Sequence, residues 1–303
     1  MAKFVPDVNT RRWVVIAPSR SSRPKDKDHD INHGATPAPE PQVELPKRNG
    51  YSFNETCPFC YGNEKSTPPE IYRWGRKDPH DPDWVVRVVP NKYPITDIHE
   101  VIIHSPDHLT DIDDFPQEHV EIILRVYRER YNALRKRGQV IIFVNVGPQS
   151  GASLQHPHSQ VVVVPHQINL DVLAIEPVGN VIEEGEHFIA WSPDFSQWPW
   201  EVWIAPKICC QREHEKGEQC FFGGIRDEQI PELSRLLQAM LQRLLVRFPE
   251  MSYNFYIFPG ECWYLRLIPR LVHRAGFELG TGLSVNIADP TTVAGELKKN
   301  GSA

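Results

Sequence analysis

The chain has 303 residues, of which 40% are hydrophobic, 24% are charged and 10% are aromatic. This length corresponds to two domains or to one large domain built by duplication, and it excludes the small scaffolds that depend on disulfide bonds. The composition is that of a globular protein, and the formal net charge of −6, from 33 basic and 39 acidic residues, argues against a surface that coats a nucleic acid polymer.

Signals for membrane insertion, secretion and disulfide bonding are weak throughout the sequence. No apolar run approaches the roughly 20 residues that a transmembrane helix needs. Pro6 and Asp7 interrupt the N-terminal segment before the apolar core of a signal peptide could form, and six cysteines in 303 residues are too few for a disulfide framework. We therefore expect a cytoplasmic protein that contacts neither a membrane nor a nucleic acid polymer.

The first half of the chain predicts short strands and one amphipathic helix. Apolar residues recur at helical spacing between residues 117 and 136, and Gly138 ends the pattern. Residues 25–50 are polar and rich in proline, which predicts a flexible surface loop. Apolar runs bounded by turn residues predict strands at 12–17, 84–90, 100–104, 140–145 and 161–165.

The second half repeats this order of elements. The pattern predicts strands at 188–191 and 201–206, a helix at 230–248, and strands at 253–258 and 263–268. Because the order strand, strand, helix, strand, loop, strand occurs twice, we predict an α+β fold built by duplication, with a mainly antiparallel sheet and one long helix in each repeat. We place the two halves at 1–168 and 169–303, with the chemistry in the first.

Two histidines and a glutamine alternate with other residues just before the strand at 161–165. A period of two puts His156, His158 and Gln160 on one face. Pro157 is tolerated at the first residues of a strand, so the motif lies at the mouth of a sheet. An isolated H-x-H pattern is explained equally well by exposed edge residues.

The loop before this motif changes that balance. Asn145, Gly147, Gly151 and Ser153 supply flexible backbone and polar groups of the kind that form an anion nest, although a plain turn between strands would also fit the loop alone. Loop and histidines together indicate a phosphoryl or nucleotidyl group held beside a nucleophile. His158 could attack an α-phosphorus and form a covalent nucleotidyl-histidine.

Two further clusters are candidates for binding. Cys57 and Cys60 have the C-x₂-C spacing of half a zinc site, which needs two more nitrogen or sulfur ligands; a loop thiol pair or a redox pair remains an alternative. Arg20 and Arg23 could bind phosphate and Asn91 a base or ribose, but charges of this kind are more often simply solvated.

Together these segments resemble the galactose-1-phosphate uridylyltransferases, the transferase branch of the histidine-triad superfamily. The resemblance covers nearly the whole chain, and the blocks that carry it stand in the same order. These blocks are residues 9–24, 57–60, 91–94, 105–108, 145–160 and 276–278. The resemblance implies that both halves are histidine-triad-like, with the C-terminal half degenerate, supporting the fold and forming a dimer.

The resemblance also implies roles for individual residues. His158 matches the nucleophile that becomes uridylylated, and Gln160 matches the glutamine that contacts the phosphoryl group. The ligands of a structural zinc are matched by Cys57, Cys60, His108 and His156. The surroundings of the nucleotide and its phosphates are matched by Arg20, Arg23, Asn91, Asn145, Gly151 and Ser153. Phe277 and Glu278 match a C-terminal segment that reaches the sugar site of the partner subunit, which implies a homodimer.

The sequence departs from the common bacterial uridylyltransferases at two places. The last strand, around Arg266, lacks the histidine pair of their second metal site, so we expect no second metal. The run from Gly276 to Gly282 is closer to the ADP-glucose phosphorylases of the same family.

The reaction that we expect first is the uridylyl transfer of galactose metabolism, from UDP-glucose to a hexose 1-phosphate. One alternative is an ADP-sugar phosphorylase, which transfers adenylyl to phosphate, and another is a hydrolase of the histidine-triad type. The alternative from a different class is a zinc-stabilised nucleotide-binding protein without catalysis.

Overall fold

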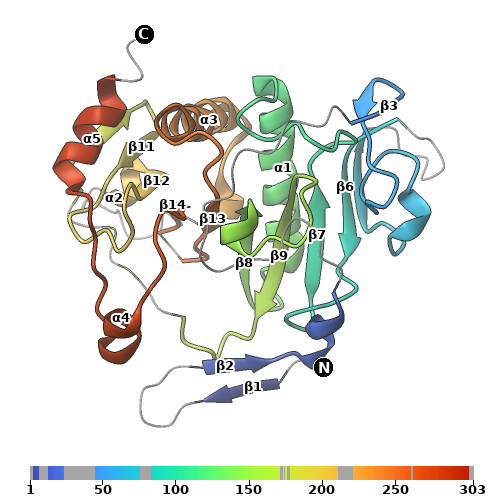
Figure 1. Cartoon of the computed structure of the whole chain (residues 1–303), viewed down its shortest axis with the longest axis horizontal. Helices are drawn as coiled ribbons and strands as arrows, with labels where there is room; N and C mark the ends of the chain where they lie inside the picture. The colour runs from blue at the N-terminus through green and yellow to red at the C-terminus, as the bar shows by residue number, and fades with distance from the viewer. Residues whose placement is uncertain are drawn as a thin grey trace. The chain divides into compact units, whose positions relative to one another are not determined.

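Figure 1 shows the computed structural model of the chain. It describes residues 3–6, 13–23, 45–75, 83–170, 173, 175, 178–210, 221–260 and 262–299. The chain divides into two compact units, the first formed by Met1–Asp111 with Val146–Val162 and the second by Ile112–Asn145 with Val163–Ala303. Most of the loop predicted at 25–50 lies outside the described residues, as does residue 12 of the first predicted strand.

The first unit contains an antiparallel sheet that carries the site described below. Strand β7 lies between β6 and β9, and β5 pairs with the other edge of β6. Its described residues also form two small antiparallel pairs, β1–β2 and β3–β4. The strand bounds are β1 Lys3–Pro6, β2 Trp13–Ile16, β3 Lys47–Arg48, β4 Tyr51–Ser52, β5 Tyr72–Gly75, β6 Trp84–Pro90, β7 His99–Ile103 and β9 His158–Val164. Three short 3₁₀ helices are Pro18–Ser22, Glu64–Ser66 and Pro148–Ser150.

The second unit contains a sheet with the strand order β10-β11-β12-β14-β13-β8. Its strands are β8 Gln139–Val146, β10 Val181–Glu184, β11 Phe188–Trp191, β12 Val202–Pro206, β13 Tyr253–Ile257 and β14 Leu265–Pro269. Its α-helices are α1 Gln117–Leu134, α2 Lys207–Cys210, α3 Ile230–Arg247, α4 Gly276–Thr281 and α5 Pro290–Lys299, and its 3₁₀ helices are Phe222–Gly224 and Asp227–Gln229.

The two long helices bury the apolar faces that the sequence predicts. In α1 the buried positions include Val120, Ile123, Tyr127 and Tyr131, which recur at three- and four-residue spacing. Helix α3 buries a leucine-rich face in the same way, and the two helices pack against each other. Their bounds agree with the predicted helices within two residues. Among the described residues, no helix is long and apolar enough to cross a membrane.

The order of elements repeats as predicted. Elements β6, β7, α1, β8 and β9 are followed by β11, β12, α3, β13 and β14. The antiparallel pairing of β6, β7 and β9 also matches that of β11, β12 and β14. The α+β class with a mainly antiparallel sheet and one long helix per repeat is therefore confirmed, whereas the boundary at residue 168 stays a prediction.

Strand register is compatible with an alignment of the repeats that matches residues 156–160 with residues 262–266. Gln160 faces Val101 across β9 and β7, and Arg266 faces Trp203 across β14 and β12. In this alignment Arg266 occupies the position of Gln160, and Tyr264, two places earlier, occupies the position of His158. Tyr264 is buried and its ring stacks on Trp203 with the centroids 4.2 Å apart. The second repeat thus has an aromatic core residue where the first has an imidazole.

Candidate active site and metal centre

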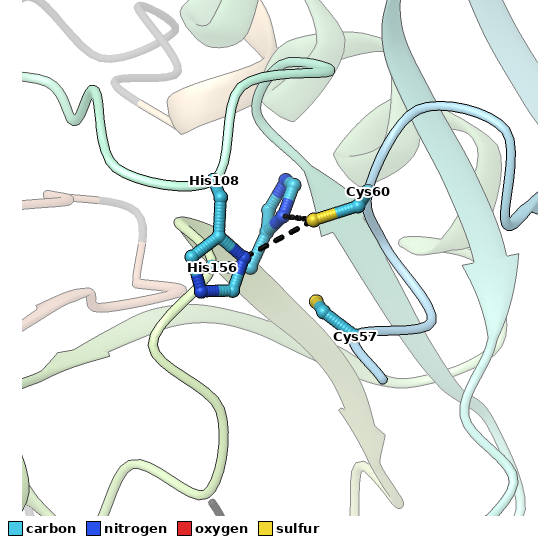
Figure 2. Close-up of side chains that lie close together, drawn as sticks. All are labelled: Cys57, Cys60, His108 and His156. Atoms are coloured by element: carbon cyan, nitrogen blue, oxygen red, sulfur yellow. Dashed lines mark hydrogen bonds between the residues drawn. The ribbon is translucent and has the colours of Figure 1, made fainter. Parts of the chain in front are cut away.

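Two cysteines and two histidines converge in the first unit (Figure 2). The ligand atoms of Cys57, Cys60, His108 and His156 all lie within 4.8 Å of one another, and the four residues are buried. Cys60 Sγ is 3.2 Å from His108 Nδ1 and 3.6 Å from His156 Nδ1. The structure thus brings together the four residues that the resemblance implies as ligands.

The geometry and chemistry of this cluster fit a tetrahedral metal ion. Metal–sulfur and metal–nitrogen bonds of zinc length give a sulfur–nitrogen separation of about 3.6 Å in a tetrahedral site, close to the two observed distances. The hydrogen bond with Cys57 is the main cause that lowers the pKa of the Cys60 thiol, and hydrogen bonds with His108 and His156 lower it further. Since a thiolate is the form that binds metal, the cluster can hold a metal ion.

Hydrogen bonds orient the His156 ring and hold the backbone at His108. His156 Nε2 donates a hydrogen bond to the carbonyl oxygen of Ser105 at 2.9 Å, which leaves Nδ1 as the ligand atom. The backbone N–H of His108 donates to the carbonyl of Ser52. Burial alone would raise the pKa of Asp107, but hydrogen bonds from Thr110, Ser52 and Leu109 outweigh it and lower that pKa.

His158 begins β9 and lies beside a cavity of about 380 Å³. Its Nδ1 is 2.8 Å from the carbonyl oxygen of His156, so Nδ1 carries the proton and donates it. The lone pair of a neutral ring is then on Nε2. The Phe59 ring packs against the imidazole with the centroids 5.3 Å apart. Burial lowers the pKa of His158 to about 4, so the ring is neutral near pH 7.

The cavity gathers six of the residues predicted for the site: Arg20, Arg23, Asn91, Ser153, His158 and Gln160. Lys92 adds a third side-chain cation, and no aspartate or glutamate is present among the described residues that line the cavity. Burial is the main cause that lowers the pKa of Arg20, and the nearby charge of Arg23 lowers it further. A cavity of this charge suits an anion with several negative oxygens.

The remaining residues predicted for the nucleotide and sugar sites are not among the described residues that line the cavity. Gly151 has the left-handed φ of +81° at the end of the 3₁₀ turn Pro148–Ser150, a conformation that favours glycine, but it is not among the described residues that line the cavity. Asn145 belongs to the second unit, where its Oδ1 accepts a hydrogen bond from Asn254. Phe277 and Glu278 lie in α4 of the same unit, and 56% of Phe277 is exposed.

Two buried histidines that sequence reasoning missed, His99 at the start of β7 and His104 directly after it, form hydrogen bonds to β9. His99 Nε2 is 3.0 Å from Gln160 Oε1. His104 is hydrogen-bonded to Ser159, and its Nδ1 is 3.5 Å from an Asp111 carboxylate oxygen. His104 and Ser159 are fully buried, so this serine, histidine and aspartate stabilise the pairing of β7 with β9 and do not reach the cavity.

Comparisons with known proteins show which proteins the whole chain is similar to. A family described as a domain of unknown function (DUF4931), N-terminal domain, matches residues 47–167. ADP-glucose phosphorylase of Arabidopsis thaliana is 29% identical, with 95% of this chain and 90% of the relative aligned. Galactose-1-phosphate uridylyltransferase of Thermotoga maritima is 24% identical, with 80% and 89% aligned.

A solved structure extends the agreement to the fold of the entire chain. The crystal structure of an ADP-glucose phosphorylase from Arabidopsis thaliana with bound ADP-glucose has a TM-score of 0.68 and 26% sequence identity, and the match covers 99% of both chains. The likeness predicted from the motifs is therefore confirmed. The chain is similar along most of its length to galactose-1-phosphate uridylyltransferases and to ADP-glucose phosphorylase.

Proposed function

We propose that the protein transfers a nucleoside monophosphate from a nucleoside diphosphate sugar to an acceptor, through a covalent intermediate on Nε2 of His158. The observation that carries the proposal is the hydrogen bond from His158 Nδ1 to the His156 carbonyl, which leaves Nε2 as the nucleophilic atom of a residue that lines the cavity. The homology to transferases and phosphorylases of nucleotide sugars supports the same reaction class.

The reaction has two displacements at the α-phosphorus. In the first, the Nε2 lone pair forms a nitrogen–phosphorus bond while the bond from phosphorus to the bridging oxygen breaks, and the sugar 1-phosphate leaves with the electron pair. In the second, an oxygen of the acceptor forms a new oxygen–phosphorus bond, and the nitrogen–phosphorus bond breaks and returns its electron pair to Nε2. The proton on Nδ1 stays in its hydrogen bond throughout.

The lining of the cavity supports a nucleoside diphosphate as donor. Arg20, Arg23 and Lys92 are the side-chain cations available for the two phosphates, and Phe59 and Leu154 offer apolar surface for the base or ribose. Gln160 is neutral, so it can donate a hydrogen bond to a phosphate oxygen without acting as a base for water. This favours transfer over hydrolysis.

For the base and the acceptor, we favour adenylyl transfer from an ADP-sugar to phosphate. The support is the alignment with ADP-glucose phosphorylase over 95% of the chain, together with the run Gly276–Gly282. The sequence motifs alone put uridylyl transfer first and the ADP-sugar phosphorylase second, so the comparison reverses that preference. Uridylyl transfer between UDP-glucose and a hexose 1-phosphate is the second candidate, favoured by the relative from Thermotoga maritima.

We further propose that zinc occupies the cluster of Cys57, Cys60, His108 and His156, because two thiolates and two imidazoles are a donor set that zinc prefers. Bound there, it would supply structural stability by joining the Cys57–Cys60 loop to the loops before β9 and after β7. The backbone of His156 would then be held in place beside His158.

The resemblance supports two further proposals, on the nucleotide site and on a dimer. Asn145, Gly151 and Ser153 would contribute to the surroundings of the nucleotide, and Phe277 and Glu278 would reach the sugar site of a partner subunit in a homodimer. We also propose that the protein acts in the cytoplasm. Sedimentation of the pure protein tests the dimer.

Intact-protein mass spectrometry tests the reaction directly. The protein is incubated separately with ADP-glucose and UDP-glucose, without acceptor, and examined for a mass increase of one AMP or one UMP. The His158→Asn variant should fold and form no adduct, whereas the control His166→Asn, at an exposed position of the second unit, should form it normally. Absence of an adduct from both donors would refute the proposal, and an adduct on His158→Asn would assign another nucleophile.

A further inference from the structure

Both ring nitrogens of His99 are engaged, and their partners determine which one carries the proton. The backbone N–H of Ile95 donates to Nδ1 at 3.0 Å. A backbone N–H cannot act as an acceptor, so Nδ1 is unprotonated and the proton of the neutral ring is on Nε2. This Nε2–H donates to Gln160 Oε1 at 3.0 Å.

The tautomer of His99 in turn decides which way the amide of Gln160 faces. An Nε2–H needs an oxygen opposite it, so the carbonyl oxygen of Gln160 faces β7 and the amide NH₂ is left for the cavity. Asn91 Nδ2 lies 3.2 Å from the same His99 nitrogen, but Asn91 Oδ1 already accepts the Tyr93 backbone N–H. The group that Asn91 turns toward His99 is therefore its NH₂, a donor that a protonated Nε2 cannot accept from, so Asn91 cannot replace Gln160 as the acceptor.

We infer that His99 is a positioning residue that locks the carboxamide of Gln160 with its NH₂ toward the cavity, so that this group donates to an oxygen of the transferred phosphoryl group. The identity of that oxygen depends on the proposed function. The orientation of the Gln160 amide depends only on the geometry of β7 and β9.

In the second repeat, polar side chains at the equivalent two positions also join neighbouring strands. The correspondence that matches Arg266 with Gln160 also matches Glu201 with His99, because each lies two residues before the strand position opposite its partner. Glu201 Oε1 is 2.6 Å from Arg266 Nε. A diagonal polar pair across these strands is thus present in both repeats, as a neutral pair beside the cavity in the first and as a buried ion pair in the second.

Neutrality of His99 is needed for this lock, since a protonated ring could not accept from Ile95. Burial is the main cause that lowers the pKa of His99 to about 4, and the charge of Arg20 and the nearby His158 lower it further, while the hydrogen bond with Gln160 has the opposite effect. The ring therefore keeps one proton over the whole range in which the protein would act.

Kinetics of a double-mutant cycle test whether His99 acts through Gln160. We expect His99→Leu to slow adduct formation at saturating donor by about tenfold to hundredfold, less than the ~10²–10³-fold effect of deleting a donor outright. Nucleotide affinity should change much less. His99→Gln, which keeps an amide donor, should recover part of the rate. In the Gln160→Leu background, His99→Leu should cause no further loss of rate. The inference would be overturned if the rate losses of His99→Leu and Gln160→Leu multiply in the double variant, or if His99→Gln recovers none of the rate.

Nitrogen NMR of protein labelled with ¹⁵N in histidine and glutamine tests the lock without turnover. At neutral pH, His99 should show a protonated Nε2 and an unprotonated Nδ1, and His99→Leu should shift the side-chain amide resonance of Gln160. The opposite tautomer, or an unchanged Gln160 amide, would refute the lock even if the wild type forms the adduct. A wild type without adduct but with these NMR signatures would refute the proposed reaction and leave the orientation of Gln160 established.

Discussion

The buried ion pair of the second repeat allows a quantitative test of how the duplicated strands are held together. Glu201 and Arg266 are almost fully buried, with side-chain exposures of 1% and 6%. We expect Glu201→Gln to destabilise the protein by about 3–5 kcal/mol, because it leaves the guanidinium buried without its counter-ion. Burial alone would lower the pKa of Arg266, but the hydrogen bonds and charge of Glu201 more than offset this and raise it.

The structure also predicts an asymmetry between the two single variants. In Arg266→Gln the carboxylate of Glu201 keeps hydrogen bonds from Trp203 Nε1 and from the backbone N–H groups of Gln197 and Trp198. In Glu201→Gln the guanidinium keeps two longer hydrogen bonds, to the Tyr256 hydroxyl at 3.2 Å and to Gln197 Oε1 at 3.4 Å. The cost of Arg266→Gln should therefore fall at the lower end of the ~3–5 kcal/mol expected for a broken buried pair.

Urea denaturation of the two single variants and the double variant measures these free energies. The double variant Glu201→Gln/Arg266→Gln contains no buried charge at these positions, so it should be more stable than the sum of the single effects predicts, with a coupling energy of about 2 kcal/mol or more. Single variants that each lose less than about 1 kcal/mol, or effects that add, would show that the pair is not energetically coupled.

Three further outcomes are expected. His108→Ala should lose bound zinc, measured by elemental analysis, and melt at least roughly 5 °C lower; an unchanged zinc content would refute the ligand assignment. The pKa of His99 is about 4 in the folded chain and ~6.5 in the unfolded chain, so the unfolded chain binds the proton first as the pH falls. The free energy of unfolding should therefore decrease by about 3 kcal/mol between pH 6.5 and pH 4. Urea denaturation at a series of pH values measures this decrease, and His99→Leu should lack the part that comes from His99. Arg23→Met should weaken ADP binding, measured by calorimetry, about tenfold or more, in line with the ~1.5–3 kcal/mol of a charge-assisted hydrogen bond; unchanged affinity would exclude Arg23 from the phosphate site.

Long periodic segments were predictable from the sequence, and short ones were not. The helical spacing of apolar residues identifies α1 and α3 because each buries one face over 18 residues. Strands β5 and β10 have four residues each and mostly half-buried side chains. Their local sequences therefore show no clear alternation, and pairing with a neighbouring strand is what makes them strands.

The site was predictable in part, for a related reason. C-x₂-C spacing marks Cys57 and Cys60, but His108 and His156 follow Cys60 by 48 and 96 residues, so no local spacing connects them. The family resemblance supplied that connection. His99 is separated from Gln160 by 61 residues and begins an apolar strand, and only the register of β7 against β9 shows that they meet.

The replacement of an imidazole by Tyr264 in the second repeat has a stoichiometric consequence. In the proposed reaction each polypeptide would use one imidazole, that of His158, at these equivalent positions of the described structure, despite its duplicated architecture. A rapid-quench experiment without acceptor should then release one molecule of sugar 1-phosphate per polypeptide and stop. The amplitude of that first turnover would count the competent molecules in a preparation.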